Sequence, residues 1–328
     1  MLISFIEVTK MDERINLSTL GKHFSDEDKA RELLEKLCWK DGVICPHCDS
    51  ERAYKLTPKE GSKTRKGLWK CASCRKQFTV TTGTIMHGSH IPISKWLLAM
   101  HLICSAKKGI SAKQLGRQLG LDEDNYQTPW FMAHRIRYAM TQEPFFSKLN
   151  GIVEVDETYI GGKAKNMHRI ERERRIQGRG AVDKAPVVTL VERGGRIKSH
   201  HMEHVTGKNL KEAMTECIES TAQIMTDESP SYFGVNEIFA DHQAVNHHKG
   251  EYVRMTAHVN SAESFHALIK RGVMGSFHHV SKRHLHRYLA EFDFRWNHRK
   301  ISDSDRTIEA VKNIGGKRLR YKDPANKK

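Results

Sequence analysis

The stretch HVNSAESFHALIK, residues 258–270, has two opposite faces if it is a helix. At about 100° per residue, Asn260, Glu263 and Lys270 fall within roughly 80° of one another, and Phe265 lies on the other side. We therefore expect the apolar face to be buried and the polar face to present an amide oxygen, a carboxylate and an ammonium group. Such a stripe suits a metal ion and a phosphate, although the solvated face of an ordinary amphipathic helix has the same pattern.

Two aspartates upstream occupy stretches that are otherwise typical of buried strands. Asp156 lies within GIVEVDETYIGG, and Asp227 ends AQIMTD. A charge at such a position is costly unless it is paired or bound to a cation. Two carboxylates and a helix oxygen would form an oxygen-only site suited to Mg²⁺ or Mn²⁺. Two such ions about 4 Å apart serve phosphodiester chemistry by activating one oxygen and stabilising another. The alternatives are a strand-end role for Asp156 and a turn role for Asp227.

Three further acidic residues lie near these aspartates, and we assign them no role. They are Glu154, Glu157 and Asp241. Because side chains alternate along a strand, Glu154 shares a face with Asp156, whereas Glu157 points to the other face.

Four of the seven cysteines form two CxxC pairs, CPHC and CASC, which are separated by 22 residues. This spacing indicates a tetrahedral zinc site on a small β-ribbon, and four thiolates close the coordination sphere, so the ion would be structural. The predicted ligands are Cys45, Cys48, Cys71 and Cys74. We interpret the three remaining cysteines as small buried side chains, and among them only Cys38 is an outside candidate for the metal.

The chain is long and strongly basic. Its 328 residues contain 55 Lys and Arg against 39 Asp and Glu, a formal charge of +16 that suits a polyanion such as nucleic acid. We find no run of about 18 apolar residues. The first residues lack a basic region, and Glu7 interrupts their apolar run, so we expect a cytoplasmic protein without a membrane partner.

Three helical patterns follow Pro92, at 94–109, 111–121 and 125–140. The second and third have the layout of a helix-turn-helix, whose second helix would enter a major groove. A three-helix linker bundle with a solvated basic face is the alternative. The expected DNA contacts in this region are Lys113, Arg117, Arg135 and Arg137.

An α/β pattern begins at Gly151. Strands are expected at 151–162, 187–193, 196–205, 222–227 and 236–241, with a hairpin turn at Gly194 and Gly195. Helices are expected at 207–221, 258–270 and 281–300. The last 28 residues are basic and polar, and we expect a frayed tail there.

The order of these blocks resembles the DDE-superfamily transposases of bacterial insertion sequences, in particular the ISXO-like branch with an N-terminal zinc ribbon. The blocks are CPHC…CASC, WFMAHRIR, VDETYIGGK, MTDESPSY and the long stretch HVNSAESFHALIKRGVMGSFHHVSKRHLHRYLAEFDFRWNHR, and the similarity covers roughly residues 30–300. The resemblance implies an RNase H-like α/β domain with a mixed five-strand sheet flanked by helices. It also implies a divalent metal, Mg²⁺ or Mn²⁺, and DNA strand cleavage and transfer.

The resemblance also implies roles for single residues. Asp156 and Asp227 match the two Asp positions of the family motif, and Asn260 matches the third position, where most members have Glu. Lys270 matches a basic residue that grips DNA phosphate, and its neighbour Arg271 is taken as a DNA contact. Because Asn supplies no charge, Glu263 is a second candidate for the third ligand, and the sequence does not decide between them.

We accordingly divide the chain into a helical segment at 1–37, a zinc ribbon at 38–91, a helix-turn-helix region at 92–145, a catalytic domain at 150–300 and a basic tail at 301–328. The resemblance implies binding of terminal inverted repeats and of target DNA, assembly as a homodimer or larger complex on DNA, and a place near the bacterial nucleoid. The competing functions are a DNA-binding regulator or inactive remnant, and a metal-dependent nuclease that does not join strands.

Overall fold

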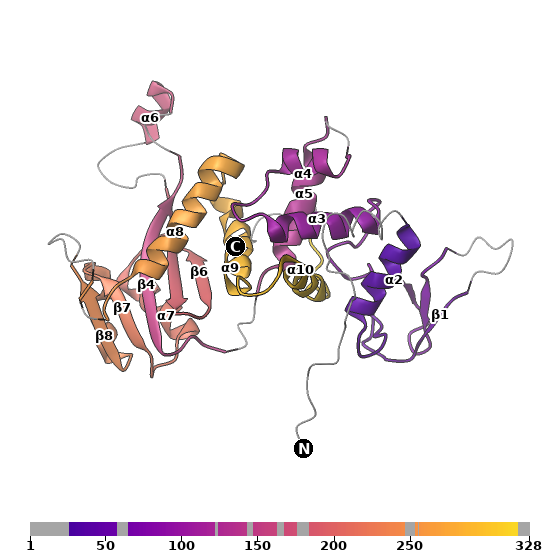
Figure 1. Cartoon of the computed structure of the whole chain (residues 1–328), viewed down its shortest axis with the longest axis horizontal. Coiled ribbons are helices and arrows are strands. Elements are labelled where there is room, and N and C mark those ends of the chain that lie inside the picture. Colours follow the sequence, from indigo (N-terminus) through magenta and orange to yellow (C-terminus); the bar gives the residue numbers. More distant parts are fainter. Residues whose placement is uncertain are drawn as a thin grey trace, which may run out of the picture. The chain divides into compact units, whose positions relative to one another are not determined.

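The computed structural model of the chain describes residues 26–57, 65–121, 124–142, 147–162, 167–175, 184–246, 253–254 and 256–320 (Figure 1). The chain forms two compact units. Unit 1 comprises Met1–Met140 and Lys300–Pro324, and unit 2 comprises Thr141–Arg299 and Ala325–Lys328. No helix in the described ranges is both long and apolar enough to span a bilayer.

Unit 1 begins with a ribbon of three short antiparallel strands, β1 (Ala53–Lys55), β2 (Trp69–Cys71) and β3 (Gln77–Phe78). Helix α2 (Glu27–Cys38) is capped by Asp26 and contacts this ribbon, since Glu35 accepts hydrogen bonds from Lys55 and from the Trp69 indole. Helix α2 therefore packs on the ribbon, whereas the predicted boundary at residue 37 assigns nearly all of this helix to a separate segment.

The helices of unit 1 are α3 (Ile93–Ser105), α4 (Ala112–Gln118), α5 (Gln127–Ala139) and α10 (Asp303–Lys312). Helix α5 packs against α3 and α4, and eight of its eleven residues from Pro129 to Ala139 are buried. A helix segment with most of its side chains buried cannot present them to a DNA groove. The prediction of α5 as a recognition helix is therefore wrong for this part of the helix, which is a core element. The turn before it includes residues 122–123, which lie outside the described residues.

The prediction of a frayed tail from residue 301 is also wrong. Ser302 caps α10 by accepting a hydrogen bond from the Asp305 amide, and α10 packs against α2 and α3. The Arg306 guanidinium donates to the Cys104 carbonyl of α3, and Val311 and Ile314 are buried. Apolar residues at helical spacing anchor this segment despite its basic composition. Residues 321–328 lie outside the described ranges.

Unit 2 contains a mixed five-strand sheet in the order β6-β5-β4-β7-β8, as an RNase H-like domain predicts. The strands are β4 (Ile152–Ile160), β5 (Ala185–Glu192), β6 (Ile197–His201), β7 (Gln223–Asp227) and β8 (Asp241–Val245). The first three pair antiparallel, while β7 runs parallel to β4 and β8 parallel to β7. At the β5–β6 turn, Gly194 adopts a φ of 73°, which favours glycine.

Helices cover both faces of this sheet (Figure 1). Side chains of α7 (Gly207–Cys217) share one core with Val153 and Val155 of β4. Side chains of α8 (Asn260–Gly272) and α9 (Leu285–Asn297) share another core with Val187 and Val191 of β5. The apolar face expected for the stretch 258–270 is thus buried on the sheet, with Phe265 and Ile269 inaccessible.

One predicted strand is misplaced. Residues 236–241 do not form a strand; instead the 3-10 turn η3 (Val235–Glu237) precedes β8, which begins at Asp241, the last residue of the predicted strand. Both stretches are short and apolar residues are few in β8, so periodicity alone does not separate them. The β4–β5 connection also contains a short helix, α6 (Arg169–Arg175).

A buried carboxyl group joins α9 to the sheet. Asp293 accepts hydrogen bonds from the Ser199 amide at 2.9 Å and the Ser199 hydroxyl at 2.8 Å. Burial nevertheless raises the pKa of Asp293 to about 7. Because the folded state then holds this proton after the unfolded chain has released it, the free energy of unfolding falls as the pH rises from about 4 to about 7.

Asp293→Asn is therefore expected to stabilise the protein most above pH 7, by a smaller amount at pH 5, and not at all below about pH 4. The amide oxygen keeps the bond from the Ser199 amide, and the amide nitrogen donates to the hydroxyl. Urea unfolding of both proteins at pH 5 and pH 8 measures the effect, and the difference between them isolates Asp293 from other titrating groups. A stability difference that is the same at both pH values would contradict this account.

Candidate active site

Three carboxylates converge where β7 ends. The side chains of Asp156, Glu157 and Asp227 offer oxygen atoms that all lie within 4.8 Å of one another, and each residue is half-buried. The pairing of β4 with β7 places Glu154 opposite Met225, so two residues later Asp156 and Asp227 stand side by side. The structure therefore brings the two predicted aspartates together.

Glu157 is the member of this cluster to which the sequence assigned no role. Side chains on β4 do alternate as expected, since Val153 and Val155 face the α7 core. However, β7 ends at Asp227 while β4 continues to Ile160. Beyond Asp227, β4 has no paired β7 residue on that side. The Glu157 side chain on one face of the sheet can therefore approach Asp156 and Asp227 around this unpaired edge of β4. The sequence predicts both the alternation along β4 and the end of β7 at Asp227, but it does not reveal the register in which β7 pairs with β4.

The environment of Glu157 favours a bound cation. Burial raises the pKa of Glu157 to about 7; the Tyr232 hydroxyl lowers it, and the charges of Asp227 and Asp156 raise it further. Glu157 Oε1 is shielded from solvent and accepts no hydrogen bond from the described residues. Clustered carboxylates with an unused buried oxygen are the donors that hard divalent cations prefer.

Glu154 fixes the start of α8 against β4. This fully buried carboxylate accepts hydrogen bonds from the backbone amides of Ser261, at 2.7 Å, and Ala262, at 3.2 Å. It also pairs with Arg193 Nε at 2.9 Å and lies 3.3 Å from His258 Nδ1. A negative charge at a helix N-terminus is stabilising. Glu154 therefore fixes the position of the α8 N-terminus. It lies two residues before Asp156 on β4, and both side chains are on the same face of the strand.

His266 of α8 reaches the carboxylate cluster directly. Its Nδ1 lies 3.3 Å from Asp156 Oδ2, and its Nε2 lies 3.0 Å from the Thr189 hydroxyl of β5. The imidazole is buried and so holds one Asp156 oxygen in a fixed orientation, as outer partners of metal ligands do. The sequence does not indicate a role for His266, because a histidine on an otherwise apolar helix face has no distinct pattern.

The polar stripe of α8 is exposed. Asn260 is the first residue of the helix, directly before the Ser261 amide that Glu154 binds, and Glu263 and Lys270 lie on solvent-accessible positions. The carboxylate cluster contains Glu157 and not Glu263. The role of Asn260 stays a prediction.

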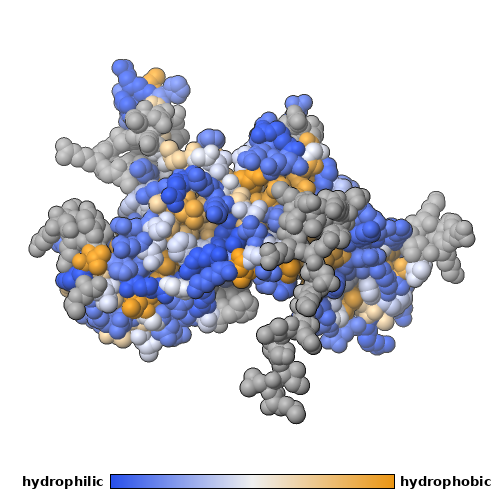
Figure 2. Space-filling model, viewed as in Figure 1, coloured by the Kyte–Doolittle hydropathy of each residue, from blue (hydrophilic) through white to orange (hydrophobic). Residues whose placement is uncertain are grey.

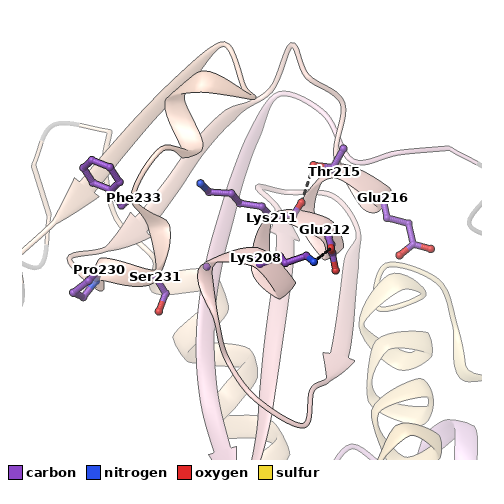
Figure 3. Close-up of a pocket in the computed structure, with 9 residues that line it drawn as sticks. Lys208, Lys211, Glu212, Thr215, Glu216, Pro230, Ser231 and Phe233 are labelled. Atoms are coloured by element: carbon purple, nitrogen blue, oxygen red, sulfur yellow. Dashed lines mark hydrogen bonds and ion pairs between the residues drawn. The ribbon is translucent and has the colours of Figure 1, made fainter. Parts of the chain in front are cut away.

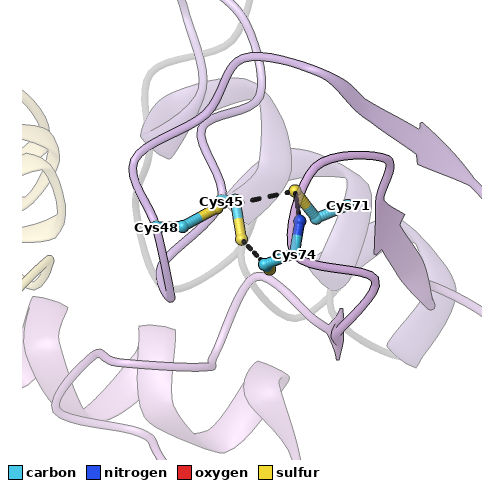
Figure 4. Close-up of side chains that lie close together, drawn as sticks. All are labelled: Cys45, Cys48, Cys71 and Cys74. Carbon is cyan, nitrogen blue, oxygen red and sulfur yellow. Dashed lines mark hydrogen bonds between the residues drawn. The ribbon is translucent and has the colours of Figure 1, made fainter.

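The four predicted cysteine ligands also form a cluster, with all four Sγ atoms within 4.8 Å (Figure 4). The Sγ atoms of Cys45 and Cys74 are 3.7 Å apart, and those of Cys48 and Cys71 are also 3.7 Å apart. Zinc–sulfur bonds of about 2.3 Å in a tetrahedron require sulfur atoms about 3.8 Å apart. The spacing thus fits a zinc ion and is far longer than the S–S bond of a disulfide, about 2.05 Å.

Geometry, rather than thiol pKa, separates the cluster from Cys38, because the pKa of the cluster member Cys48 is also raised, to about 12. The backbone N–H of Cys74 donates to Cys71 Sγ and lowers the pKa of the Cys71 thiol to about 6, which favours the thiolate that binds metal. Burial raises the pKa of Cys38 to about 12. Cys38 lies outside the cluster.

The residues predicted to contact DNA differ in their exposure to solvent. Lys113 and Arg117 are exposed on α4, and Lys270 and Arg271 are exposed on α8. Arg135 and Arg137, however, are only 6% and 2% exposed. The Arg135 guanidinium donates to the His87 carbonyl and lies over the rings of Trp96 and Phe131. The prediction that these two arginines contact DNA directly is therefore wrong, because they belong to the core of unit 1.

A hollow on unit 2 lies apart from the carboxylate cluster (Figure 3). It lies between α7 and the turn η2 (Pro230–Tyr232), and residues of both elements line it, including Lys208, Lys211 and the 87% exposed Phe233. None of the three clustered carboxylates lines this hollow. The carboxylates sit instead at a strand end.

Sequence comparisons identify proteins and domains that are similar to most of this chain. The ISXO2-like transposase domain matches residues 148–297, and the transposase zinc-ribbon domain matches residues 25–77. An uncharacterized protein in transposable element ISH50 of Halobacterium salinarum is 30% identical over 283 residues, which cover 84% of this chain and 92% of that protein. A chain in the crystal structure of a pre-cleavage Mos1 transpososome aligns with 62% of this chain and 74% of its own length, at 14% identity and a TM-score of 0.25.

The matched zinc-ribbon domain contains the four-cysteine cluster, and the matched transposase domain contains the three clustered carboxylates. The ISH50 protein is similar over nearly its whole length. The chain belongs to the family of ISXO2-like transposases with an N-terminal zinc ribbon.

Proposed function

We propose that this chain is the active transposase of an insertion sequence, which binds the terminal repeats of its element and cleaves and joins DNA strands. The observation that carries this proposal is the convergence of Asp156, Glu157 and Asp227 at one strand end, within a domain of the transposase family. A divalent cation bound there would activate an attacking oxygen and stabilise the leaving oxygen of a phosphodiester.

The side chains of this site would share the work as follows. Asp156 and Asp227 hold the cation from adjacent strands, and His266 keeps the Asp156 carboxylate in place. Asn260 contributes a neutral oxygen from the start of α8, and Lys270 neutralises a DNA phosphate. The reaction needs no covalent enzyme intermediate, so no serine or tyrosine nucleophile is assigned.

Asn260 occupies the third position of the family motif and supplies no negative charge, whereas Glu157 can supply one to the same site. Asn260 is neutral, and we propose that Glu157, rather than Glu263, supplies the third negative charge beside Asp156 and Asp227. Its oxygen lies within 4.8 Å of theirs, and Glu263 is not part of that cluster.

Glu157→Gln is therefore expected to reduce end cleavage by more than about 10-fold, since changes around a metal site commonly cost 10-fold to 100-fold. Glu263→Gln is the matched control, because it makes the same chemical change on the exposed face of α8, and it is expected to be mild. Cleavage of labelled element-end DNA, titrated with Mn²⁺ and with Mg²⁺, measures both. A dead Glu263→Gln protein beside an active Glu157→Gln protein would reverse this assignment.

The DNA on either side of the gene distinguishes the transposase from the other candidates. Short inverted repeats at both ends, bordered by a duplicated target sequence, are expected if the protein moves its own gene. If the protein is a regulator, or a nuclease that does not join strands, inverted repeats and target duplications are not expected beside its gene. Their absence would count against transposition by this element.

A further inference from the structure

The segment that follows the active-site helix is basic and free of acidic residues. From Ser264 to Ala290 the chain contains no Asp or Glu. Helix α8 continues into the π-helical turn η5 (Val273–Phe277), and the 3-10 turn η6 (Lys282–His284) then leads into α9. Six basic or imidazole side chains of this segment are exposed, and we call them the π-turn surface: Lys270, Arg271, His278, His279, Lys282 and Arg283.

The backbone at the centre of this surface is strained. His278 has φ 59° and ψ −44°, and the His279 amide donates to the Phe277 carbonyl at 2.6 Å. This geometry is close to that of a classic γ-turn, which is rare and strained for a residue with a side chain. Strained residues and π-helical turns both concentrate at functional sites.

Aromatic packing holds the strained turn in place. The Phe277 ring lies 4.8 Å from the Tyr288 ring and 6.3 Å from the Phe292 ring, both on α9, in edge-to-face geometry. Leu285, at the start of α9, is buried in the same core. The turn is thus anchored from below, while the side chains of His278 and His279 remain exposed.

The π-turn surface begins close to the carboxylate cluster. His266 contacts Asp156, and Lys270 follows one helical turn later, a rise of about 6 Å along α8. Figure 2 shows mainly hydrophilic residues around α8 on this face of unit 2. A positively charged surface beside a phosphodiester-processing site complements a negatively charged backbone.

We propose that the π-turn surface binds the phosphate backbone of duplex DNA adjacent to the strand that the carboxylate site cleaves. The proposal rests on the proposed function and extends it from the two contacts predicted on α8, Lys270 and Arg271, to the turn at 278–283. Lysine and arginine contacts to phosphates fix the position of a duplex without reading its sequence. The surface would therefore hold element ends and target DNA alike.

The salt dependence of DNA binding tests this proposal. Each phosphate that a protein neutralises contributes about 0.9 to the slope of log K against log salt concentration. The double variant Lys282→Ala with Arg283→Ala is therefore expected to lower the magnitude of that slope by about 1 to 2. The full chain with its zinc is titrated against a fluorescent duplex of arbitrary sequence, about 40 base pairs long, in buffer without Mg²⁺ or Mn²⁺.

A second pair of lysines provides the matched control. Lys208→Ala with Lys211→Ala also removes two positive charges, but from α7, on the opposite face of the same sheet. This pair is expected to leave the slope unchanged. The charge-preserving pair Lys282→Arg with Arg283→Lys is expected to retain the wild-type slope, and thermal unfolding of each variant confirms that it is folded.

Equal slopes for wild type and the Lys282 and Arg283 variant, or an equal loss with the Lys208 and Lys211 variant, would overturn the proposal. Because the titration contains no catalytic cation, its outcome is independent of cleavage. A slope change in a protein that never cleaves DNA would support the surface and refute the proposed function. If the wild-type protein cleaves DNA but the Lys282 and Arg283 variant has the wild-type salt slope, the proposed function is supported and the role of the π-turn surface is refuted.

Discussion

Replacing Asp156 or Asp227 by alanine is expected to lower strand cleavage by more than about 100-fold, the upper loss found for outer partners of metal ions, because each removes a direct oxygen donor. The two carboxylates stand side by side on parallel strands, and neither can replace the other. Binding of element-end DNA is expected to remain, since charge elsewhere on the chain supplies most of it. Gel-resolved cleavage and anisotropy-based binding, performed on the same preparations, separate the two effects.

Asp241→Ala is the control for this pair. Asp241 begins β8, next to β7, but it lies outside the carboxylate cluster and accepts a hydrogen bond from Gln243. Its loss is expected to leave cleavage within a few-fold of wild type. If Asp156→Ala or Asp227→Ala cleaves as fast as Asp241→Ala, the carboxylate site does not perform the chemistry.

Loss of the cysteine cluster is expected to unfold the zinc ribbon. Its three strands contain only two or three residues each, and its small core consists mainly of the cysteines and the aromatic residues beside them. Structural zinc contributes about 10–16 kcal/mol in zinc-finger peptides, which exceeds what so small a core supplies. The double variant Cys45→Ser with Cys71→Ser should therefore lose zinc, and its ribbon should unfold.

Zinc content and near-ultraviolet circular dichroism measure this loss. The Trp39 and Trp69 rings pack edge to face at 5.4 Å beside the cluster, so their signal reports on the ribbon. Cys38→Ser is the control, because Cys38 lies outside the cluster, and it is expected to keep one zinc per chain. A double variant with wild-type stability and DNA binding would exclude a structural role for the metal.

The sequence predicts those features that depend on local spacing. The two CxxC pairs indicate the four-cysteine cluster, since the knuckle spacing and the strands between them determine its geometry. Alternation along β4 and the apolar face of α8 likewise place Asp156 and Phe265. Asp227 follows because a charged residue rarely ends a buried strand without a partner.

Features that depend on tertiary packing escape the same reasoning. Arg135 has the same basic character as Arg117, yet Trp96 and Phe131 cover it, and no local pattern announces that packing. Glu157 joins the cluster through the register in which β7 pairs with β4, which the two strand patterns do not reveal. The buried anchor Glu154 depends on Arg193 and on the start of α8, which are distant in the sequence.

We expect the carboxylate site to cleave and join DNA with a divalent cation. Purified zinc-loaded protein, incubated with labelled element-end DNA and a target duplex, with and without Mg²⁺ or Mn²⁺, tests this expectation most directly when cleaved and joined products are scored separately. Both products are expected with either cation, and neither product is expected without a divalent cation or from the Asp156→Ala protein. Cleavage and joining that persist without a divalent cation, or in the Asp156→Ala protein, would contradict this expectation.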